Sequence, residues 1–162
     1  MSPKGPAQRG RRGSRSASSV RNPDDRTDAR ERALILLYEA ESKDVPPKEV
    51  LATQVLPTDE LTRVLVEGVQ EHQARLDASI AAHAKGWTLA RMPAIDRNVL
   101  RIAGFELLCL ADVPVAVVLD EAVELAKRFS TDDSGRFVNG VLSALALELR
   151  PELTASDRAG ND

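Results

Sequence analysis

Residues 93–108 read PAIDRNVLRIAGFELL and carry a clear helix pattern. Pro93 suits the first turn of a helix, where its missing N–H costs no hydrogen bond. The apolar side chains that follow recur every three or four residues, on one helix face: Ile95, Val99, Ile102, Ala103 and Leu107. This pattern predicts an amphipathic helix whose polar side chains occupy its other faces, namely Asp96, Arg97, Arg101 and Glu106.

Similar patterns predict helices before this stretch, over about 28–42, 47–54 and 59–85. We expect Asp28 to cap the first of them and Thr58 to cap the third, because both residue types accept hydrogen bonds from amides at a helix start. One short helical turn fits the segment near residues 87–89.

Two more helices are expected after the stretch. Asp112 and Pro114 form a cap-then-proline start for one, and the last long helix extends from near Ser134 to Pro151. No segment has the two-residue period of a strand. The sequence therefore predicts an all-α fold class, with six to seven helices in two small packed helical bundles joined near Gly86.

The first 25 residues differ in composition from the rest. Residues 1–21 hold six basic side chains and no acid, whereas the 162-residue chain has a net charge of −3, so that residues 22–162 carry −9. With many Gly, Ser and Pro residues and few apolar ones, this segment cannot bury enough surface to offset the entropy of ordering. We expect residues 1–25 to be a disordered basic arm, 26–153 an all-helical domain and 154–162 a frayed tail.

A flexible arginine-rich arm can bind a polyanion by releasing counterions, or it can serve only as a solubilising extension. The chain has 29% charged residues and no apolar run near the roughly 20 residues that a bilayer span needs. Its start also lacks the apolar core of a secretory signal. We therefore expect a soluble, cytoplasmic protein without a membrane contact.

The residues that usually carry catalysis are few. His72 and His83 lie about 16 Å apart along one helix, so they cannot share a metal ion. We interpret Asp132 and Asp133 as groups that cap a helix start rather than as acids or metal ligands. Cys109 has no histidine close in sequence, which favours a buried small hydrophobe. Without a glycine-rich phosphate loop either, the sequence predicts no enzyme, no cofactor and no metal site.

Residues 130–140 have the properties of a binding surface. A helix that starts there offers unpaired amides to a phosphate, with the Arg136 guanidinium beside them. Phe137 either stacks on an unpaired base or begins the apolar core stripe of the helix, and the residues alone favour the second interpretation. Asp133 opposes phosphate at this place. Trp87 is interpreted as a plug between the helix groups rather than as a base-stacking platform or a partner anchor.

Several motifs occur in one order and with compatible spacing. They are LYE at 37–39, GW at 86–87, PAIDRNVLRIA at 93–103, DVP at 112–114, DEAVELAK at 120–127 and FVNGVL at 137–142. From about Arg26 to Arg150 this pattern resembles the NusB family of transcription antitermination factors.

The resemblance implies an all-helical RNA-binding protein that is not an enzyme. It implies pairing with the small-subunit ribosomal protein NusE and binding of single-stranded boxA RNA in ribosomal RNA transcripts. It further implies a transcription complex with RNA polymerase and other Nus factors that keeps transcription processive.

The resemblance also implies roles for individual residues. The implied RNA-binding residues are Arg26, Arg30, Arg32, Arg136 and Phe137, with Asp133 as an adjacent modulator. The implied partner-binding residues are Tyr38, an amphipathic ring, and Asp96, a carboxylate that can pair with a cation on a basic protein.

One departure from the family pattern concerns RNA. Asp24, Asp25 and Asp28 interrupt the arginine cluster that relatives place before the first helix, and the basic residues lie instead within 9–21. We therefore expect the arm to supply the electrostatic attraction to RNA and the folded edge to supply base contacts.

Two alternative functions fit the same helices. The fold resembles the RNA-binding front domain of some ribosomal RNA cytosine methyltransferases, and an acidic helical body can also act as an adaptor that docks only proteins. The sequence leaves both the monomer and the homodimer open.

Overall fold

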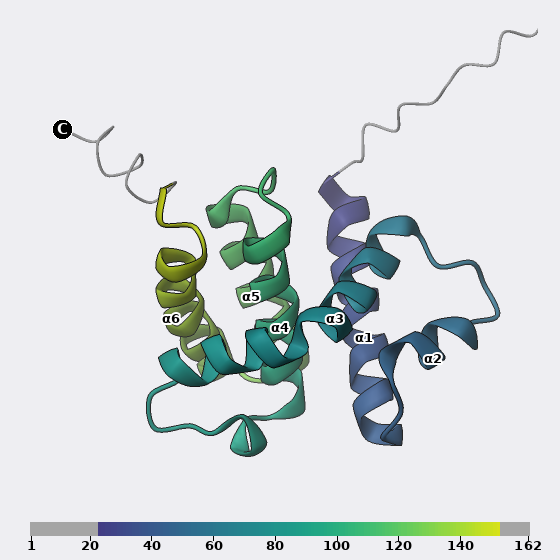
Figure 1. The fold of residues 1–162 in the computed structure, drawn as a ribbon, viewed down its shortest axis with the longest axis horizontal. Helices are drawn as coiled ribbons and strands as arrows, with labels where there is room; N and C mark the ends of the chain where they lie inside the picture. The colour runs from purple at the N-terminus through teal and green to yellow at the C-terminus, as the bar shows by residue number, and fades with distance from the viewer. Residues whose placement is uncertain (1–22, 153–162) are drawn as a thin grey trace, which may run out of the picture.

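A computed structural model describes residues 23–152, which are almost entirely helical (Figure 1). The arm up to residue 22 and the tail from residue 153 lie outside the described residues. The elements are α1 (Pro23–Lys43), α2 (Pro47–Ala52), α3 (Glu60–His83), the 3-10 turn η1 (Leu89–Arg91), α4 (Ala94–Cys109), α5 (Val115–Phe129) and α6 (Asp132–Leu149). The predicted all-α class is confirmed, and no helix among these residues is long and apolar enough to cross a bilayer.

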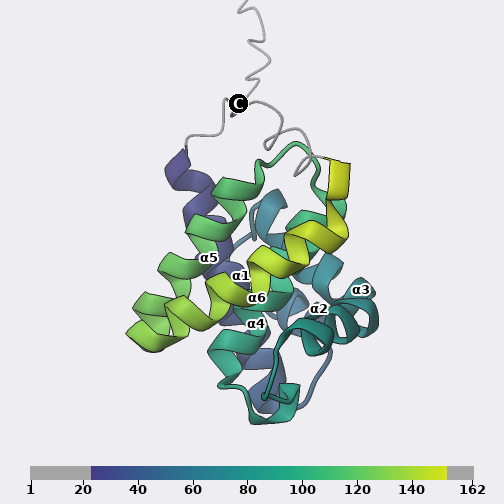
Figure 2. The same cartoon turned by 90° about the vertical axis from the view of Figure 1, so that its left-hand side faces the viewer.

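The helices form two groups that share α3. Helices α1 and α2 pack against the first part of α3, while α4 and α6 pack against its second part and α5 packs on α4 and α6 (Figures 1 and 2). At 24 residues, α3 is about 36 Å long and reaches across both groups. The groups are thus joined along α3 rather than near Gly86, and their buried apolar side chains form one continuous cluster.

Helix α1 begins earlier than the sequence indicated. The predicted cap Asp28 lies inside the helix, which starts at Pro23 and takes in residues 23–25 of the expected arm. A proline suits the first helical position, and Asp25 in the first turn favours the positive end of the helix dipole. Asp25, one of the acids that interrupt the basic cluster, therefore contributes to the start of the helix.

Two further caps differ from the expectation by one or more residues. Asp59, not Thr58, caps α3, because its carboxylate accepts a hydrogen bond from the Thr62 amide at 2.6 Å. Thr131 caps α6 by accepting from the Ser134 amide at 3.1 Å. Asp132 and Asp133 consequently lie in the first turn of α6 rather than before it.

Neighbouring helices cover α4 on several sides, so both of its acidic residues are buried although they lie off the apolar stripe. Asp96 is 3% exposed and Glu106 is 2% exposed, because α1, α3, α5 and α6 all contact α4. Glu106 accepts two hydrogen bonds from Nε and Nη2 of Arg30 on its Oε1 atom, at 3.0 and 2.7 Å. Burial raises the pKa of the Glu106 carboxyl, and the hydrogen bond and charge of Arg30 oppose that rise.

The residue that follows α6 closes the carboxyl end of α4. Arg150 is 6% exposed and donates to the carbonyls of Glu106, Leu107 and Leu110 at 2.7 to 2.8 Å. Carbonyls at the end of a helix have no partner within it, so a guanidinium placed there satisfies several at once. Arg150 thereby fixes the end of α6 to the centre of the fold.

Candidate nucleic-acid interface

One charged and one aromatic residue, Arg136 and Phe137, follow each other just after the first turn of α6. Arg136 is exposed, whereas Phe137 is half-buried and packs against the core with part of its ring. The hydroxyl of Ser134 hydrogen-bonds with the hydroxyls of Ser130 and Thr131 at 2.9 and 3.0 Å, which holds the turn before the helix in place. The contact of Phe137 with the core agrees with the interpretation that the residues alone favoured, and stacking of its exposed part on a base stays a prediction.

A cavity of about 210 Å³ opens beside this turn. It is lined by Trp87, Met92, Pro93, Asp96, Thr131, Asp133, Ser134 and Phe137. The rings of Trp87 and Phe137 lie with centroids 6.2 Å apart and planes tilted by 59°. Since Trp87 is 51% exposed, the interpretation of this residue as a plug between helix groups is wrong.

The cavity unites residues that the sequence assigned to two separate roles. Phe137 and Asp133 were expected at RNA and Asp96 at a protein partner, yet all three line the same space. Asp96 Oδ1 is buried and has no hydrogen-bond partner among the described residues. Asp133, in contrast, is exposed at the helix start.

The structure does not bring the three predicted arginines of α1 to this cavity. Arg26 is half-buried and lines a different cavity, together with Glu60 and Asp112. Arg32 is half-buried and donates to Gln54 at 3.4 Å. Arg30 is 2% exposed, and its guanidinium is held by Glu106, so its expected RNA contact needs correction: it is an interior residue.

Sequence reasoning missed two cations at the end of α5. Arg128 is exposed, and its Nη1 atom forms an ion pair with Glu31 of α1 at 3.1 Å. Lys127 is exposed as well, and its side chain lies against Gly135 in the first turn of α6. Lys127 and Arg128 come shortly before the segment 130–140 in the sequence, and this position could have indicated them. Together with Arg136 they extend the positive charge from α5 to α6.

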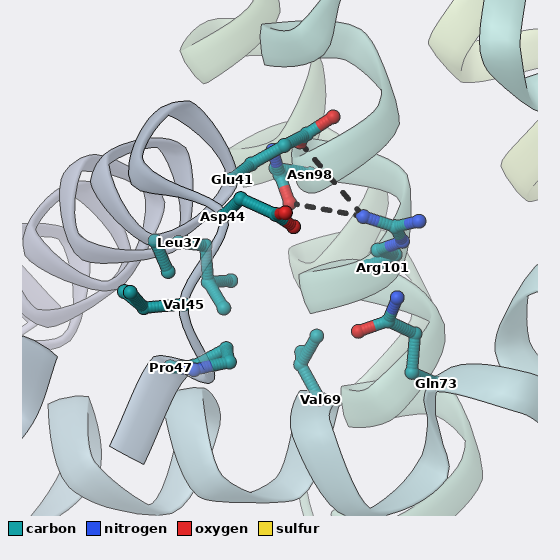
Figure 3. A pocket seen from close by; sticks show the side chains of 10 residues that line it. Leu37, Glu41, Asp44, Val45, Pro47, Val69, Gln73, Asn98 and Arg101 are labelled. Carbon is teal, nitrogen blue, oxygen red and sulfur yellow. Dashed lines mark hydrogen bonds and ion pairs between the residues drawn. The ribbon is translucent and has the colours of Figure 1, made fainter. Parts of the chain in front are cut away.

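A second surface lies on the outer side of α1. Tyr38 is 45% exposed and Ile35 is 51% exposed, and their spacing of three residues places them on one helix face. A polar cavity of about 220 Å³ lies near them, between α1, α3 and α4. Figure 3 shows Glu41, Asn98 and Arg101 converging at its rim, where the Asn98 amide donates to Glu41 at 2.8 Å.

The environment of Cys109 also differs from the expectation. The thiol is exposed, and its Sγ atom lies 3.7 Å from Nε2 of His72, so it is not a buried hydrophobe. Desolvation and the nearby charge of Glu71 raise the pKa of this thiol, which keeps it protonated and weakens it as a nucleophile. Within residues 23–152 no three His, Cys, Asp or Glu side chains gather closely enough to hold a metal ion.

Comparison with known proteins decides the family. Residues 27–147 match the NusB family, which is three-quarters of the chain. The chain belongs to the NusB family. The resemblance that its motifs indicated is thereby confirmed, and the NusB family is one of transcription antitermination factors rather than enzymes.

Individual NusB relatives agree with this assignment. The transcription antitermination protein NusB of Salinispora arenicola is 52% identical over 128 residues, which cover 75% of this chain and 94% of the relative. A solved NusB of T. maritima is 34% identical with a TM-score of 0.72, covering 81% of this chain and 96% of that one. A chain from a solved complex of antitermination factors NusB and NusE with double-stranded RNA is 28% identical with a TM-score of 0.66, covering 76% and 96%.

Proposed function

We propose that this chain binds single-stranded boxA-type RNA together with the small-subunit ribosomal protein NusE, as part of its role as an antitermination factor. The pair acts on ribosomal RNA transcripts in the cytoplasm, within a complex of RNA polymerase and other Nus factors. The solved relative in complex with NusE and double-stranded RNA supports NusE and RNA as partners, and the preference for a single strand rests on the side chains at the start of α6.

One observation carries the RNA part of the proposal: Phe137 and Trp87 both leave ring surface open at the start of α6, beside the exposed Arg136. Stacking of a base on an aromatic ring contributes about 1–3 kcal/mol and is available only to bases that are not paired. A guanidinium next to the ring can hold the phosphate of the same strand. This combination suits a single strand better than a duplex.

The positive charge for the phosphates comes from several places. Three exposed cations lie on either side of the turn between α5 and α6: Lys127, Arg128 and Arg136. The arm of residues 1–21 adds six more cations. Arg26 and Arg32 extend the charge along α1, while Asp133 limits affinity at the helix start. Arg30 is left out of this surface, because its guanidinium is buried against Glu106.

The partner surface centres on Tyr38. Its half-exposed ring and the neighbouring Ile35 form an apolar pair that water covers poorly. Asp44 is exposed near them and complements a basic ribosomal protein, whereas the nearby carboxylate of Glu41 is paired with Arg97 and Asn98. Asp96 is the second residue that we place at the partner, because its carboxylate lines the cavity beside α6 and can pair with a cation of a basic protein there.

The test combines two substitutions with two binding measurements. Gel shifts with boxA-type RNA and co-purification with NusE are measured for Phe137→Asp, Tyr38→Asp and, as a matched control, Leu147→Asp. Leu147 is 48% exposed on α6 and belongs to neither surface, so this control introduces the same charge at a neutral place.

We expect Phe137→Asp to weaken RNA binding at least tenfold with little effect on NusE, and Tyr38→Asp to weaken NusE binding first. Leu147→Asp should change neither. Equal losses of both activities in the two variants, or a wild-type pair that does not shift the RNA, would contradict the proposal.

A further inference from the structure

The cavity that Arg26 lines lies apart from the cavity beside α6 and from the outer side of α1. It has a volume of about 240 Å³ and lies between the first turns of α1 and α3 and the end of α4. Its charged lining residues are Arg26, Arg30, Glu60, Glu106 and Asp112, so that three carboxylates and two arginines give the lining a net charge of −1. Arg30 and Glu106 are buried and neutralise each other through hydrogen bonds of 2.7 to 3.1 Å.

The lining of this cavity suits a long side chain that ends in a positive charge. Leu61, Val64, Leu110 and Val113 provide apolar walls, whereas the acids at the mouth are exposed. Arginine and lysine bury an apolar stem and keep the charged end at polar groups. The volume is below the range of about 300–1,000 Å³ of pockets that hold drug-sized ligands, so the space fits one side chain better than a separate small molecule.

The surface around the mouth is acidic as well. Asp25 and Asp28 are exposed in the first turns of α1, and Asp59 is exposed directly before α3. Arg63, one turn along α3 from Glu60, lines a different cavity beside α2. Residues 22–162 together carry a charge of −9. This end of the molecule therefore attracts a basic segment.

The basic segment with the shortest connection to the mouth is the arm of the same chain. Residues 1–21 hold six cations and no acid, and the arginines of residues 9–15 come 8 to 14 residues before Pro23. Eight residues can span roughly 26–29 Å, whereas Arg26 lies only about 4.5 Å along α1 from Pro23. A short covalent linker gives an effective concentration in about the millimolar range, which a basic segment of another protein lacks.

We propose that, in the chain without RNA, an arginine of residues 9–15 occupies this cavity and pairs with the carboxylates of Glu60 and Asp112. The mouth of the cavity then competes with RNA phosphates for the arm. RNA gains the electrostatic attraction of the arm only when it displaces this contact, which disfavours RNA that is held by the arm alone. The inference goes beyond the proposed function, because it concerns the chain before RNA is bound.

The first measurement uses the full chain without RNA. A spin label is attached at Ser14→Cys in a Cys109→Ser background, and it broadens the signals of methyl groups that come close to the arm. The native arm is compared with an arm variant of the same length, in which each arginine of residues 9–15 is replaced by glutamine. It is also compared with a cavity variant, Glu60→Gln/Asp112→Asn. Thermal unfolding checks that each variant is folded.

We expect the native arm to broaden the methyl signals of Val64, Leu110 and Val113 strongly. The arm variant and the cavity variant should both broaden them less, because the ion pairs are lost while the linker stays the same. The methyl signals of Leu147, which is exposed on α6, should stay sharp in all three chains.

The second measurement adds NusE and a boxA-type RNA. The matched control is Glu49→Gln/Glu71→Gln, which removes the same charge from exposed positions on α2 and α3. We expect the cavity variant to bind the RNA about fivefold more tightly than this control, since up to two exposed ion pairs no longer hold the arm. In chains that also carry the arm variant, the difference between the two should disappear.

Two results would overturn the inference: equal broadening with the native arm and the arm variant, or a gain in RNA affinity that persists when the arginines of the arm are absent. Both leave the proposed function standing. That function fails separately if the wild-type chain and NusE do not bind the RNA, and the first measurement then still decides where the arm lies.

Discussion

Two carboxylates of α4 are equally buried but differ in what surrounds them. Glu106, near the carboxyl end of the helix, receives a forked hydrogen bond from Arg30 and has the guanidinium of Arg150 nearby. Asp96, near the amino end, lines an open cavity, and its Oδ1 atom has no hydrogen-bond partner within residues 23–152. The two ends of α4 thus serve different purposes. The carboxyl end joins α1 to the core through Glu106, whereas the amino end faces an open cavity.

The largest effect is expected from substitutions that break the pair of Arg30 and Glu106 at the carboxyl end of α4. Arg30→Ala or Glu106→Ala leaves the other charge buried without its partner, which should lower the free energy of unfolding by about 3–5 kcal/mol. Urea denaturation followed by circular dichroism measures this loss. The double variant Arg30→Met/Glu106→Leu removes both charges and should recover most of the stability. A single variant that unfolds like the wild type would show that the pair is not structural.

The same pair predicts a dependence of stability on pH. Burial raises the pKa of Glu106 above its usual 4.5, with Arg30 opposing the rise, so the folded protein holds this proton more tightly than the unfolded chain does. The contribution of Glu106 to stability is therefore greatest at or below pH 4.5 and decreases as pH rises through the folded pKa. We expect the stability of the wild type relative to Glu106→Gln to fall from pH 4.5 toward neutrality. A relative stability that rises with pH in urea titrations would contradict the sign.

The contrast between the two ends explains which parts of the molecule the sequence could predict. Helices were predictable because apolar side chains repeat at 3.6 residues, and the helix start at residues 130–140 was predictable as a candidate binding segment because it carries Arg136 and Phe137. The burial of Asp96 and Glu106 was not, because charged residues off the apolar stripe look solvated until neighbouring helices cover them. Arg30 and Glu106 are 76 residues apart, so no local pattern connects them.

The assignment of Arg30 to RNA failed for a related reason. Arg30 and Arg32 lie in the same helix and have the same chemistry, but only the fold shows that one is interior. Arg128 was missed as a candidate RNA contact, because a cation in the last turn of α5 is already explained by the negative end of the helix dipole. Its closeness to α6 and to Glu31 depends on how α1, α5 and α6 are arranged.

A smaller effect on stability is expected at the amino end of α4, where Asp96 lies. Asp96→Asn keeps the size of the side chain but removes a buried charge without a partner, so we expect the free energy of unfolding to rise by about 1 kcal/mol. Glu106→Gln on the same helix should lower it. Thermal denaturation of the two variants in parallel measures both signs. If Asp96→Asn also destabilises, Asp96 has a structural partner and the idea of an acceptor held ready for a ligand loses its basis.

The smallest expected effect concerns charge at the rim of the open end. Arg136 is exposed where we place an RNA phosphate, so Arg136→Gln should reduce the slope of log affinity against log salt concentration by about 0.7, the value for one phosphate contact with a single strand. Arg63→Gln, which removes an equally exposed arginine from α3 beside α2, is the matched control and should leave the slope unchanged.

Deletion of residues 1–21 should lower the slope further, because the arm holds six cations, while the preference among bases stays the same. Fluorescence titrations between low and moderate salt separate these contributions. Loss of a cation that contacts phosphate changes the slope of log affinity against log salt. Loss of a residue that contacts a base changes the affinity by the same factor at every salt concentration. An unchanged slope in Arg136→Gln would remove this residue from the RNA edge and leave the arm as the source of the attraction.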